Sequence, residues 1–392
     1  MKNIIIKNGI ILSKDFEFYK GDLNISNGVI VDYELNDAEI IDAENLYIVP
    51  GLVDIHFHGC NGHDFCEGTQ EAFKAIYDYD TSQGILSICP ATMTLPEENL
   101  LKIMKEAKKF SNLAGIYLEG PFISKNKLGA QNPAYVVKPD FNMLEKLQTA
   151  SGNLIKIAAV APEVEGAFNF IEQAKKITKL SLAHTACNYE TADKAFNLGV
   201  SQVTHLFNAM PGINHRNPGP IIAALENKNV NVEIICDGVH IHPAIVRSTL
   251  KIFGSDRVIF ISDSMEATGM NDGIYELGGQ KVIKTGNKAL LEDNKTIAGS
   301  VTNLMDCVRT AVKEMNIPLE TAIKCASFNP AKAIGLENII ENGKNAKIIA
   351  LDKNLNLIFS INYNKHSLFS TKPLHRVAVP LPLTGAARKI VQ

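Results

Sequence analysis

The 392-residue sequence lacks several features that would indicate particular classes of protein. No apolar run approaches the roughly 18 residues that a membrane-spanning helix requires. The 39 Lys and Arg side chains are nearly balanced by 42 Asp and Glu side chains, which gives a formal net charge of -3. Without a strong basic or acidic bias, nucleic acid and anionic membranes are poor candidates for partners.

The N-terminal segment MKNIIIKNGIIL also lacks the organisation of a secretion signal, because Lys7, Asn8 and Gly9 interrupt its apolar stretch and no small-residue cleavage site follows. The seven cysteines are scattered, without the close pairs typical of zinc knuckles or redox motifs. We expect them to be reduced thiols. The sequence therefore predicts a cytoplasmic protein.

Patterning divides the chain into four parts. Residues 1–49 alternate apolar and polar positions in short runs such as NIIIKNGIIL, which indicates short antiparallel strands. Residues 346–370 return to this pattern, and neither end alone has enough strands to be stable. We expect the two ends to form one small β-sandwich domain. Residues 371–392 differ in composition from the body of the chain, and we treat them as a separate tail without assigned function.

Residues 50–345 alternate strand-like apolar runs with helical stretches such as EENLLKIMKEAKKFSNL, which would supply the crossovers between parallel strands. Eight runs occur: LVDIHFHG, GILSICPATM, LAGIYLEGPF, IKIAAVAP, LSLAHTAC, SQVTHLFNAM, NVEIICDGVH and RVIFISDSM. Eight β-then-α units predict an α/β fold, a (β/α)8 TIM-like barrel. An open doubly wound sheet is the alternative, although it would normally have fewer strands.

Metal-capable side chains stand at or just beyond the ends of five of these runs. His56 and His58 end the first run, and their i, i+2 spacing points both imidazoles to one face of a strand. The third, fifth, sixth and eighth runs end in Glu119, His184, His205 and Asp263. One histidine at a strand end is more often structural than a ligand, but barrel enzymes place their active sites at the carboxyl ends of their strands. The pattern predicts a metal site whose mixed ligands suit Zn, Fe, Mn or Co.

Six motifs, in order, carry a resemblance to a known family. PGLVDIHFHG resembles the first-strand motif of the amidohydrolase superfamily, and LEGPFI, AHTAC, THLFNAMPG, DGVH and SDSMEATG together resemble N-acetylglucosamine-6-phosphate deacetylases. The resemblance covers about residues 48–340. It implies hydrolysis of N-acetyl-D-glucosamine 6-phosphate to D-glucosamine 6-phosphate and acetate, in amino-sugar catabolism.

The resemblance also implies roles for the metal-capable residues. Glu119 would be shared between two cation positions, one completed by His184 and His205 and the other held by His56 and His58. One or two divalent ions per subunit follow, with Zn or Fe preferred and Mn or Co as alternatives. Asp263 would bind metal and act as the general base. Amide hydrolysis independently favours such a carboxylate, since one group can accept a proton from water and return it to the leaving amine.

Five further residues are implied as contacts of the substrate. Asn208 and the backbone of Ala209 would bind the sugar phosphate, and His240 the sugar or its phosphate. Arg216 would bind the phosphate bidentately from the neighbouring subunit, which implies a homodimer. Gln131 stands where many relatives carry a histidine that polarises the acetyl carbonyl. Its amide can donate a hydrogen bond but cannot carry a proton, so we expect a weaker carbonyl contact.

Other functions stay open at this point. An N-acetylgalactosamine-6-phosphate deacetylase or a D-aminoacylase would use the same metal ligands. The dihydroorotase branch is disfavoured, since Lys156 lies near the start of the fourth run and no lysine is placed to bridge metals. A non-catalytic barrel that serves as a scaffold would be expected to lose ligands, and all six are present.

Overall fold

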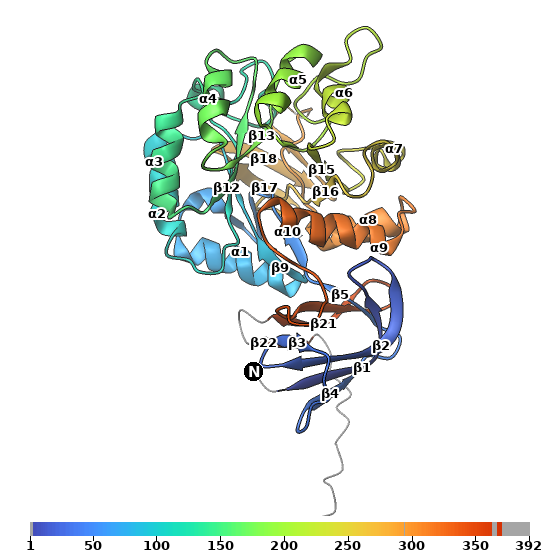
Figure 1. Ribbon diagram of the computed structural model, residues 1–392. Coiled ribbons are helices and arrows are strands. Elements are labelled where there is room, and N and C mark those ends of the chain that lie inside the picture. The colour runs from blue at the N-terminus through green and yellow to red at the C-terminus, as the bar shows by residue number, and fades with distance from the viewer. Residues whose placement is uncertain (1–2, 294, 363–366, 371–392) are drawn as a thin grey trace, which may run out of the picture. The chain divides into compact units, whose positions relative to one another are not determined.

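The computed structural model describes residues 3–293, 295–362 and 367–370 and divides the chain into two compact units (Figure 1). Met1–Val49 and Ile340–Gln392 form the first unit, and Pro50–Ile339 form the second. The sequence prediction had placed the second boundary at residue 345. The segment expected to be a tail, residues 371–392, lies outside the described residues. Across the described ranges, every helix is too short or too polar to span a bilayer.

Strands from both ends of the chain share one sheet in the first unit. The order is β22-β21-β20-β5-β1-β2-β3, and β4 also pairs with β1. The strands are β1 (Ile4–Leu12), β2 (Phe18–Ser26), β3 (Val29–Val31), β4 (Glu39–Asp42), β5 (Tyr47–Pro50), β20 (Lys347–Leu351), β21 (Leu357–Asn362) and β22 (Ser367–Ser370). Ile6, Ile25, Ile48 and Phe359 are fully buried in its core. Alternation along each strand places these apolar side chains on one face.

The second unit contains the parallel strands of the barrel. They are β6 (Leu52–Asp54), β9 (Ile85–Ile88), β10 (Ala91–Thr92), β11 (Ile116–Leu118), β12 (Ile155–Val160), β13 (Lys179–Leu182), β14 (Gln202–Val203), β15 (Asn231–Ile235) and β16 (Val258–Ile261). One sheet runs from β10 to β16 in chain order, and β6 pairs with β9. Beyond the first and last strands, Asp263 N donates to His56 O at 3.0 Å and His58 N to Ser264 O at 2.7 Å. These bonds join the two ends, as the (β/α)8 prediction requires.

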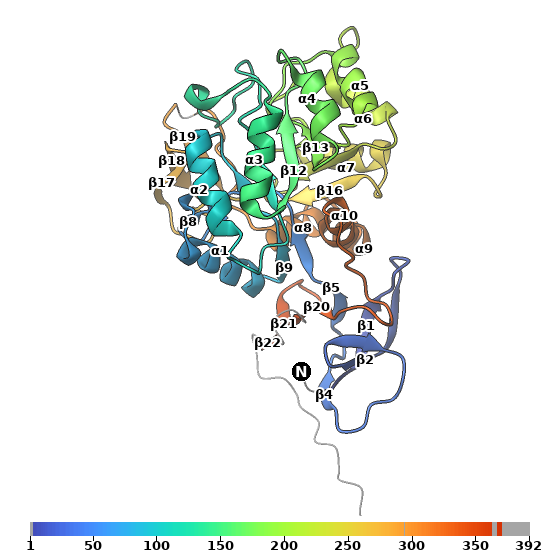
Figure 2. The same cartoon turned by 60° about the vertical axis from the view of Figure 1, so that its left-hand side comes forward.

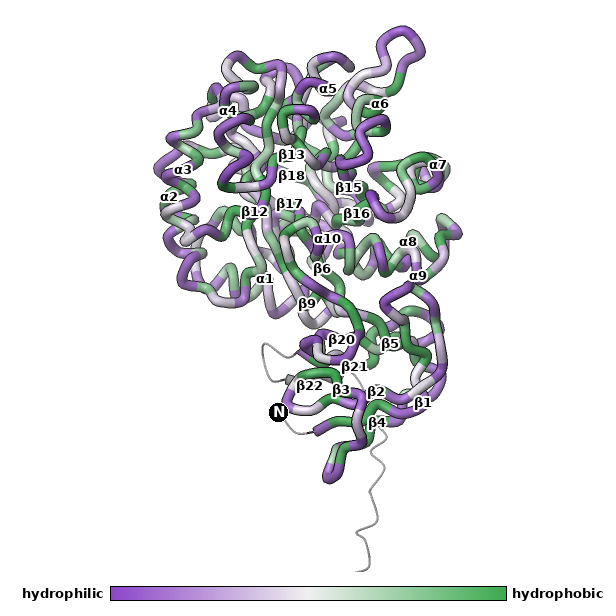
Figure 3. The backbone as a smooth tube through the Cα atoms, in the orientation of Figure 1, coloured by the Kyte–Doolittle hydropathy of each residue, from purple (hydrophilic) through white to green (hydrophobic). Residues whose placement is uncertain are grey.

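Helices surround the strands in both views of the second unit (Figures 1 and 2). They are α1 (Gln70–Ser82), α2 (Glu97–Ala107), α3 (Phe141–Ser151), α4 (Ala167–Ala174), α5 (Tyr189–Leu198), α6 (Gly219–Glu226), α7 (Pro243–Phe253), α8 (Leu304–Lys313), α9 (Leu319–Ile323) and α10 (Asn329–Ala333). In α2, Leu100, Ile103, Met104 and Ala107 are buried, which is the spacing of one helical face. The alternating colours of the outer helices in Figure 3 reflect the same amphipathic pattern.

An insertion follows the eighth strand run. It forms a three-stranded antiparallel sheet of β17 (Gly273–Leu277), β18 (Gln280–Thr285) and β19 (Lys288–Leu291). Leu277 and Val282 pack with Met93 and Met265 in a buried cluster. This cluster fixes the insertion against the strand ends of the second unit.

Candidate metal centre and substrate cavity

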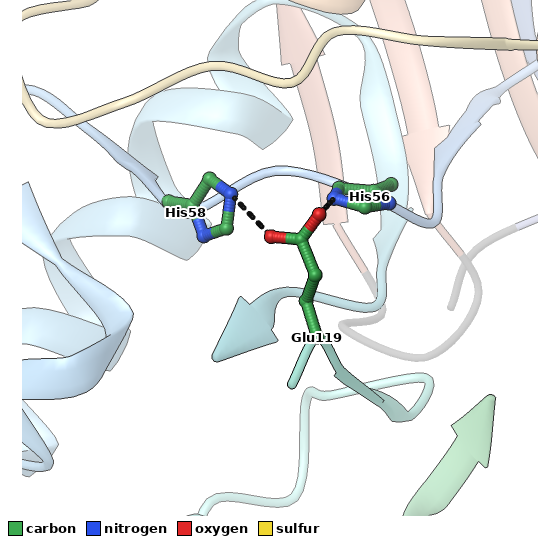
Figure 4. Close-up of side chains that lie close together, drawn as sticks. All are labelled: His56, His58 and Glu119. Atoms are coloured by element: carbon green, nitrogen blue, oxygen red, sulfur yellow. Dashed lines mark ion pairs between the residues drawn. The ribbon is translucent and has the colours of Figure 1, made fainter. Parts of the chain in front are cut away.

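The six side chains predicted as metal ligands lie together beyond the carboxyl ends of β6, β11, β13, β14 and β16. All are buried: His56, His58, Glu119, His184, His205 and Asp263. Two groups have ligand atoms close enough to share an ion, His56 with His58 and Glu119, and Glu119 with His184 and His205. Figure 4 shows Glu119 between His56 and His58, with one carboxylate oxygen toward each.

The two oxygens of Glu119 face different imidazoles. Oε1 lies 3.1 Å from His184 Nε2, 2.9 Å from His205 Nε2 and 3.3 Å from His56 Nε2. Oε2 lies 3.2 Å from His58 Nε2. A carboxylate can bind two cations through its two oxygens, so Glu119 could bridge two ions in this orientation.

The donor set fits divalent cations. The Nε2 atoms of His184 and His205 are 3.2 Å apart and face the same carboxylate oxygen. His56 Nε2 is buried and lies 3.3 Å from Glu119 Oε1, but among the described residues it makes no hydrogen bond of regular geometry. A buried polar atom without a partner is costly, and coordination to a cation would satisfy it. Mixed imidazole and carboxylate donors suit zinc and the late first-row metals.

Neighbouring groups hold two of the imidazoles in a ligating orientation. His56 Nδ1 lies 3.1 Å from Glu233 Oε2, and His184 Nδ1 lies 3.0 Å from the carbonyl oxygen of Lys127. When the Nδ1–H of a neutral imidazole donates a hydrogen bond to one of these oxygens, the Nε2 lone pair faces Glu119. The sequence reading missed Glu233. The sequence could have indicated Glu233 as a charged residue within the apolar run NVEIIC. A buried carboxylate is rare unless it has a partner, so such a residue calls for one.

The same geometry shifts proton affinities. Burial lowers the pKa of the His58 imidazole, but hydrogen bonds and charge from Asp263 and Glu119 outweigh it and raise that pKa to about 10. Burial raises the pKa of the Asp263 carboxyl, but the hydrogen bond to His58 and the nearby imidazoles hold that pKa below its usual range. Protons and metals compete for the same lone pairs, so both shifts show that the centre favours positive charge.

Three of the six side chains sit on strained backbone. The φ angles are 42° at His184, 29° at His205 and 50° at Asp263. Residues other than glycine seldom adopt this left-handed region, and such strain is concentrated at functional sites. The turns after β13, β14 and β16 thus direct these side chains inward at a conformational cost.

A cavity of about 320 Å³ opens beside the centre, and five of the six predicted ligands line it; His56 is not among the lining residues. Gln131, Asn208, Ala209 and His240 line it as well. His240 Nδ1 lies 2.7 Å from Asp237 Oδ2. Arg216 is exposed and does not join the described lining residues. One chain therefore brings together every predicted substrate contact except Arg216.

The amide of Gln131 is engaged by protein groups on both sides. Its Nε2 donates to Glu119 Oε2 at 2.8 Å, and its Oε1 accepts from the backbone N of Thr94 at 2.8 Å. The side chain is buried. Gln131 therefore contacts the Glu119 carboxylate directly, on the oxygen that also faces His58.

Comparisons with known proteins agree with this architecture. The model of the Amidohydrolase family matches residues 47–377. N-acetylglucosamine-6-phosphate deacetylase of Bacillus subtilis (strain 168) is 30% identical over 380 residues, covering 92% of this chain and 96% of the relative. N-acetylgalactosamine-6-phosphate deacetylase of Escherichia coli O157:H7 is 29% identical, covering 86% and 91%.

Solved structures give the same result. A mutant N-acetyl-D-glucosamine-6-phosphate deacetylase from Mycobacterium smegmatis, in complex with N-acetyl-D-glucosamine-6-phosphate, is similar with a TM-score of 0.87 and 29% identity, covering 92% of this chain and 98% of that one. The enzyme from Thermotoga maritima has a TM-score of 0.85 and 28% identity, covering 94% and 100%. These matches confirm the fold and the resemblance carried by the six motifs, and the chain belongs to the amidohydrolase family.

Proposed function

We propose that this chain is a metal-dependent deacetylase that hydrolyses N-acetyl-D-glucosamine 6-phosphate to D-glucosamine 6-phosphate and acetate. The observation that carries the proposal is the Glu119 carboxylate shared among four imidazoles, with Asp263 beside them at the wall of a cavity. Relatives and solved structures with this activity in their names, matched over most of the chain, support the choice of substrate.

Up to two cations would be held by the chain. Glu119, His184 and His205 would hold one, and Glu119, His56 and His58 the other. The nitrogen and oxygen donors favour Zn or Fe, with Mn or Co as alternatives. When bound, such a cation lowers the pKa of water and polarises the amide carbonyl.

Asp263 would move the proton. Its Oδ1 lies 3.4 Å from His58 Nε2 and 3.8 Å from His56 Nε2, and its lowered pKa keeps it ionised at neutral pH. An ionised carboxylate at this position can accept a proton from the attacking water and return it to the leaving amine. His58, through its contact with Asp263, would fix the direction of that carboxylate.

The other cavity residues would bind and orient the substrate. We assign the phosphate and sugar to Asn208, the Ala209 backbone and His240, and to Arg216 from a second subunit of a cytoplasmic homodimer. The exposure of Arg216 is consistent with a role outside its own cavity. Gln131 would position Glu119 through its 2.8 Å hydrogen bond, rather than contact the acetyl carbonyl.

Acetate release from four sugars would test the proposal: the N-acetyl derivatives of glucosamine and galactosamine, each with and without the 6-phosphate. The metal content of the same sample is measured before and after chelation. We expect the gluco phosphate to be the best substrate, with turnover lost on chelation and restored by divalent metal. Equal rates with and without phosphate, or turnover that survives complete metal removal, would reject it.

The galacto phosphate is the second candidate, because the Escherichia coli relative with that name matches 86% of the chain. A higher kcat/KM for N-acetylgalactosamine 6-phosphate would make that sugar the preferred substrate, and the proposed reaction, deacetylation, would stay the same. Absence of turnover on all four sugars in metal-loaded protein would instead favour a non-catalytic barrel.

A further inference from the structure

The cavity has an unusual distribution of charge. Its described lining includes the carboxylates of Glu119 and Asp263, which the metals would neutralise, and four imidazoles. Lys295 alone among those lining residues carries a Lys or Arg side chain. A sugar phosphate brings up to two negative charges into the cavity, and a partly buried anion requires a cationic or hydrogen-bonding partner. The described lining thus offers one strong cationic partner within the same subunit.

Lys295 lies at the tip of a structured hairpin. Beyond β19, the returning chain pairs with it, as Leu291 N donates to Thr296 O at 2.9 Å and Ala298 N donates to Ala289 O at 3.0 Å. This pairing fixes the backbone on both sides of the turn that contains Lys295.

The turn itself is fixed by one carboxylate. Asp293 Oδ1 accepts from the backbone N of Lys295 and of Thr296, each at 2.8 Å, and its Oδ2 accepts from the Thr296 hydroxyl at 2.6 Å. Such a side-chain turn holds the backbone of Lys295 in place. The Thr296 hydroxyl is occupied as a donor, so the ammonium of Lys295 is the group at this tip with donors suited to an anion.

The returning chain then joins the catalytic strand end. Ser300 N donates to Asp263 O at 2.7 Å, and Met265 N donates to Ser300 O at 3.0 Å. Gly299 has φ 65°, and a Cβ at that position would lie 3.1 Å from Asp263 O. Only the four residues 296–299 therefore lie between Lys295 and Ser300, which is hydrogen-bonded to the backbone of the proposed base.

We propose that Lys295 is a specificity-determining residue that binds the phosphate of the substrate from within the same subunit. The assignment rests on the proposed function, which requires a phosphorylated sugar in this cavity. Lys295 complements Arg216, since Arg216 lies outside the lining of its own chain's cavity. Each cavity then holds one cation of its own for the phosphate, on a hairpin anchored to Asp263.

Substitution of Lys295 in the metal-loaded enzyme tests this assignment. Lys295→Met removes the charge but keeps an unbranched side chain, and Lys295→Arg keeps the charge. We expect Lys295→Met to lower the ratio of kcat/KM between N-acetylglucosamine 6-phosphate and N-acetylglucosamine about tenfold, through KM, and to weaken its salt dependence. Lys295→Arg should restore most of the ratio.

Lys288 provides a matched control. It is an exposed lysine on β19 of the same hairpin and does not line the cavity. Lys288→Met should therefore leave the ratio unchanged. An unchanged ratio in Lys295→Met, or equal losses for Lys288→Met and Lys295→Met, would overturn the assignment.

A binding measurement separates this assignment from the proposed function. Calorimetry compares glucosamine 6-phosphate with glucosamine on wild type and Lys295→Met. If Lys295→Met binds only the phosphorylated sugar more weakly than wild type does, the assignment of Lys295 to the phosphate is supported. This holds even if wild type proves to hydrolyse another acyl group. Equal binding of the phosphorylated sugar by both proteins rejects Lys295 even if wild type is the expected deacetylase.

Discussion

The core of the first unit and the carboxyl ends of the second unit's strands are both buried, but in opposite ways. The first unit buries isoleucines such as Ile6, Ile25 and Ile48, whose pleated backbone needs no special conformation. The strand ends bury four imidazoles and two carboxylates, three of them on left-handed backbone. Apolar burial stabilises a fold, whereas clustered polar groups on strained backbone destabilise it unless a ligand compensates. The first region should therefore control stability and the second should control turnover.

The largest effect should come from Asp263→Asn. Loss of the proton-accepting carboxylate should lower kcat about 1000-fold. The fold should be retained because asparagine tolerates the left-handed region that φ 50° requires. Acetate release and thermal unfolding of the same preparation are the measurements. Loss of unfolding cooperativity together with activity would show that Asp263 has a structural role.

The converse effect is expected from Ile25→Ala in the first unit. Truncation of this fully buried side chain should lower the free energy of unfolding by about 3 kcal/mol. The kcat of the remaining folded protein should stay within about twofold of wild type. Chemical denaturation and steady-state kinetics at low denaturant test this, with exposed Tyr33→Ala as a control expected to cost less than about 0.5 kcal/mol. A fall in kcat without loss of stability would contradict the proposal that the core of the first unit controls stability and the strand ends of the second unit control turnover.

Gln131→Leu tests the hydrogen bond that Gln131 donates to Glu119. Removal of the donor to Glu119 Oε2 should weaken metal binding about tenfold or more, as for other groups that orient metal ligands. Chelator competition measures this independently of turnover. Unchanged metal affinity combined with a higher KM would instead support the contact with the acetyl carbonyl predicted from the sequence.

The smallest effect concerns the Asp237–His240 pair. Burial lowers the pKa of His240, but the hydrogen bond and charge of Asp237 outweigh it and raise the pKa overall; burial raises the pKa of Asp237, but His240 holds that pKa below its ordinary value. The raised His240 pKa contributes stability fully below its unfolded pKa of about 6.5, and this is lost as pH rises through the folded value. The lowered Asp237 pKa contributes stability above its unfolded pKa of about 3.9, and this is lost as pH falls through the folded value.

Both contributions of this pair are complete between about pH 4 and 6.5. Asp237→Asn should therefore reduce the free energy of unfolding most in that window and less at alkaline pH. Denaturant titrations at several pH values provide the measurement. A difference that grew toward alkaline pH would contradict the assigned directions of the two shifts.

The barrel and the clustering of the potential metal ligands could be predicted from the sequence for a common reason. Each apolar run forms a strand. The side chains that follow these strands converge because parallel strands share one carboxyl edge. Neither point requires knowledge of distant contacts. His56 and Glu119 are thus placed by local pattern and by the rule for barrel active sites.

Contacts between distant segments could not be predicted from the sequence. Glu233 is one strand residue among many until the fold places it 3.1 Å from His56 Nδ1. The hydrogen bond from Gln131 to Glu119 depends on the path of a loop, and the position of Lys295 depends on an insertion pairing back on itself. Periodicity indicates which face of a helix or strand a residue occupies. It does not indicate which atom of a distant segment will contact that residue.

The single carboxylate of Glu119 has one further consequence. Because both groups of potential ligands include it, a cation in one group would withdraw charge from the other. Linkage makes such an influence reciprocal, so each cation must alter the affinity for the other by the same factor. If both groups bind an ion, metal loading would be a cooperative equilibrium in which the affinity for the second ion depends on the identity of the first.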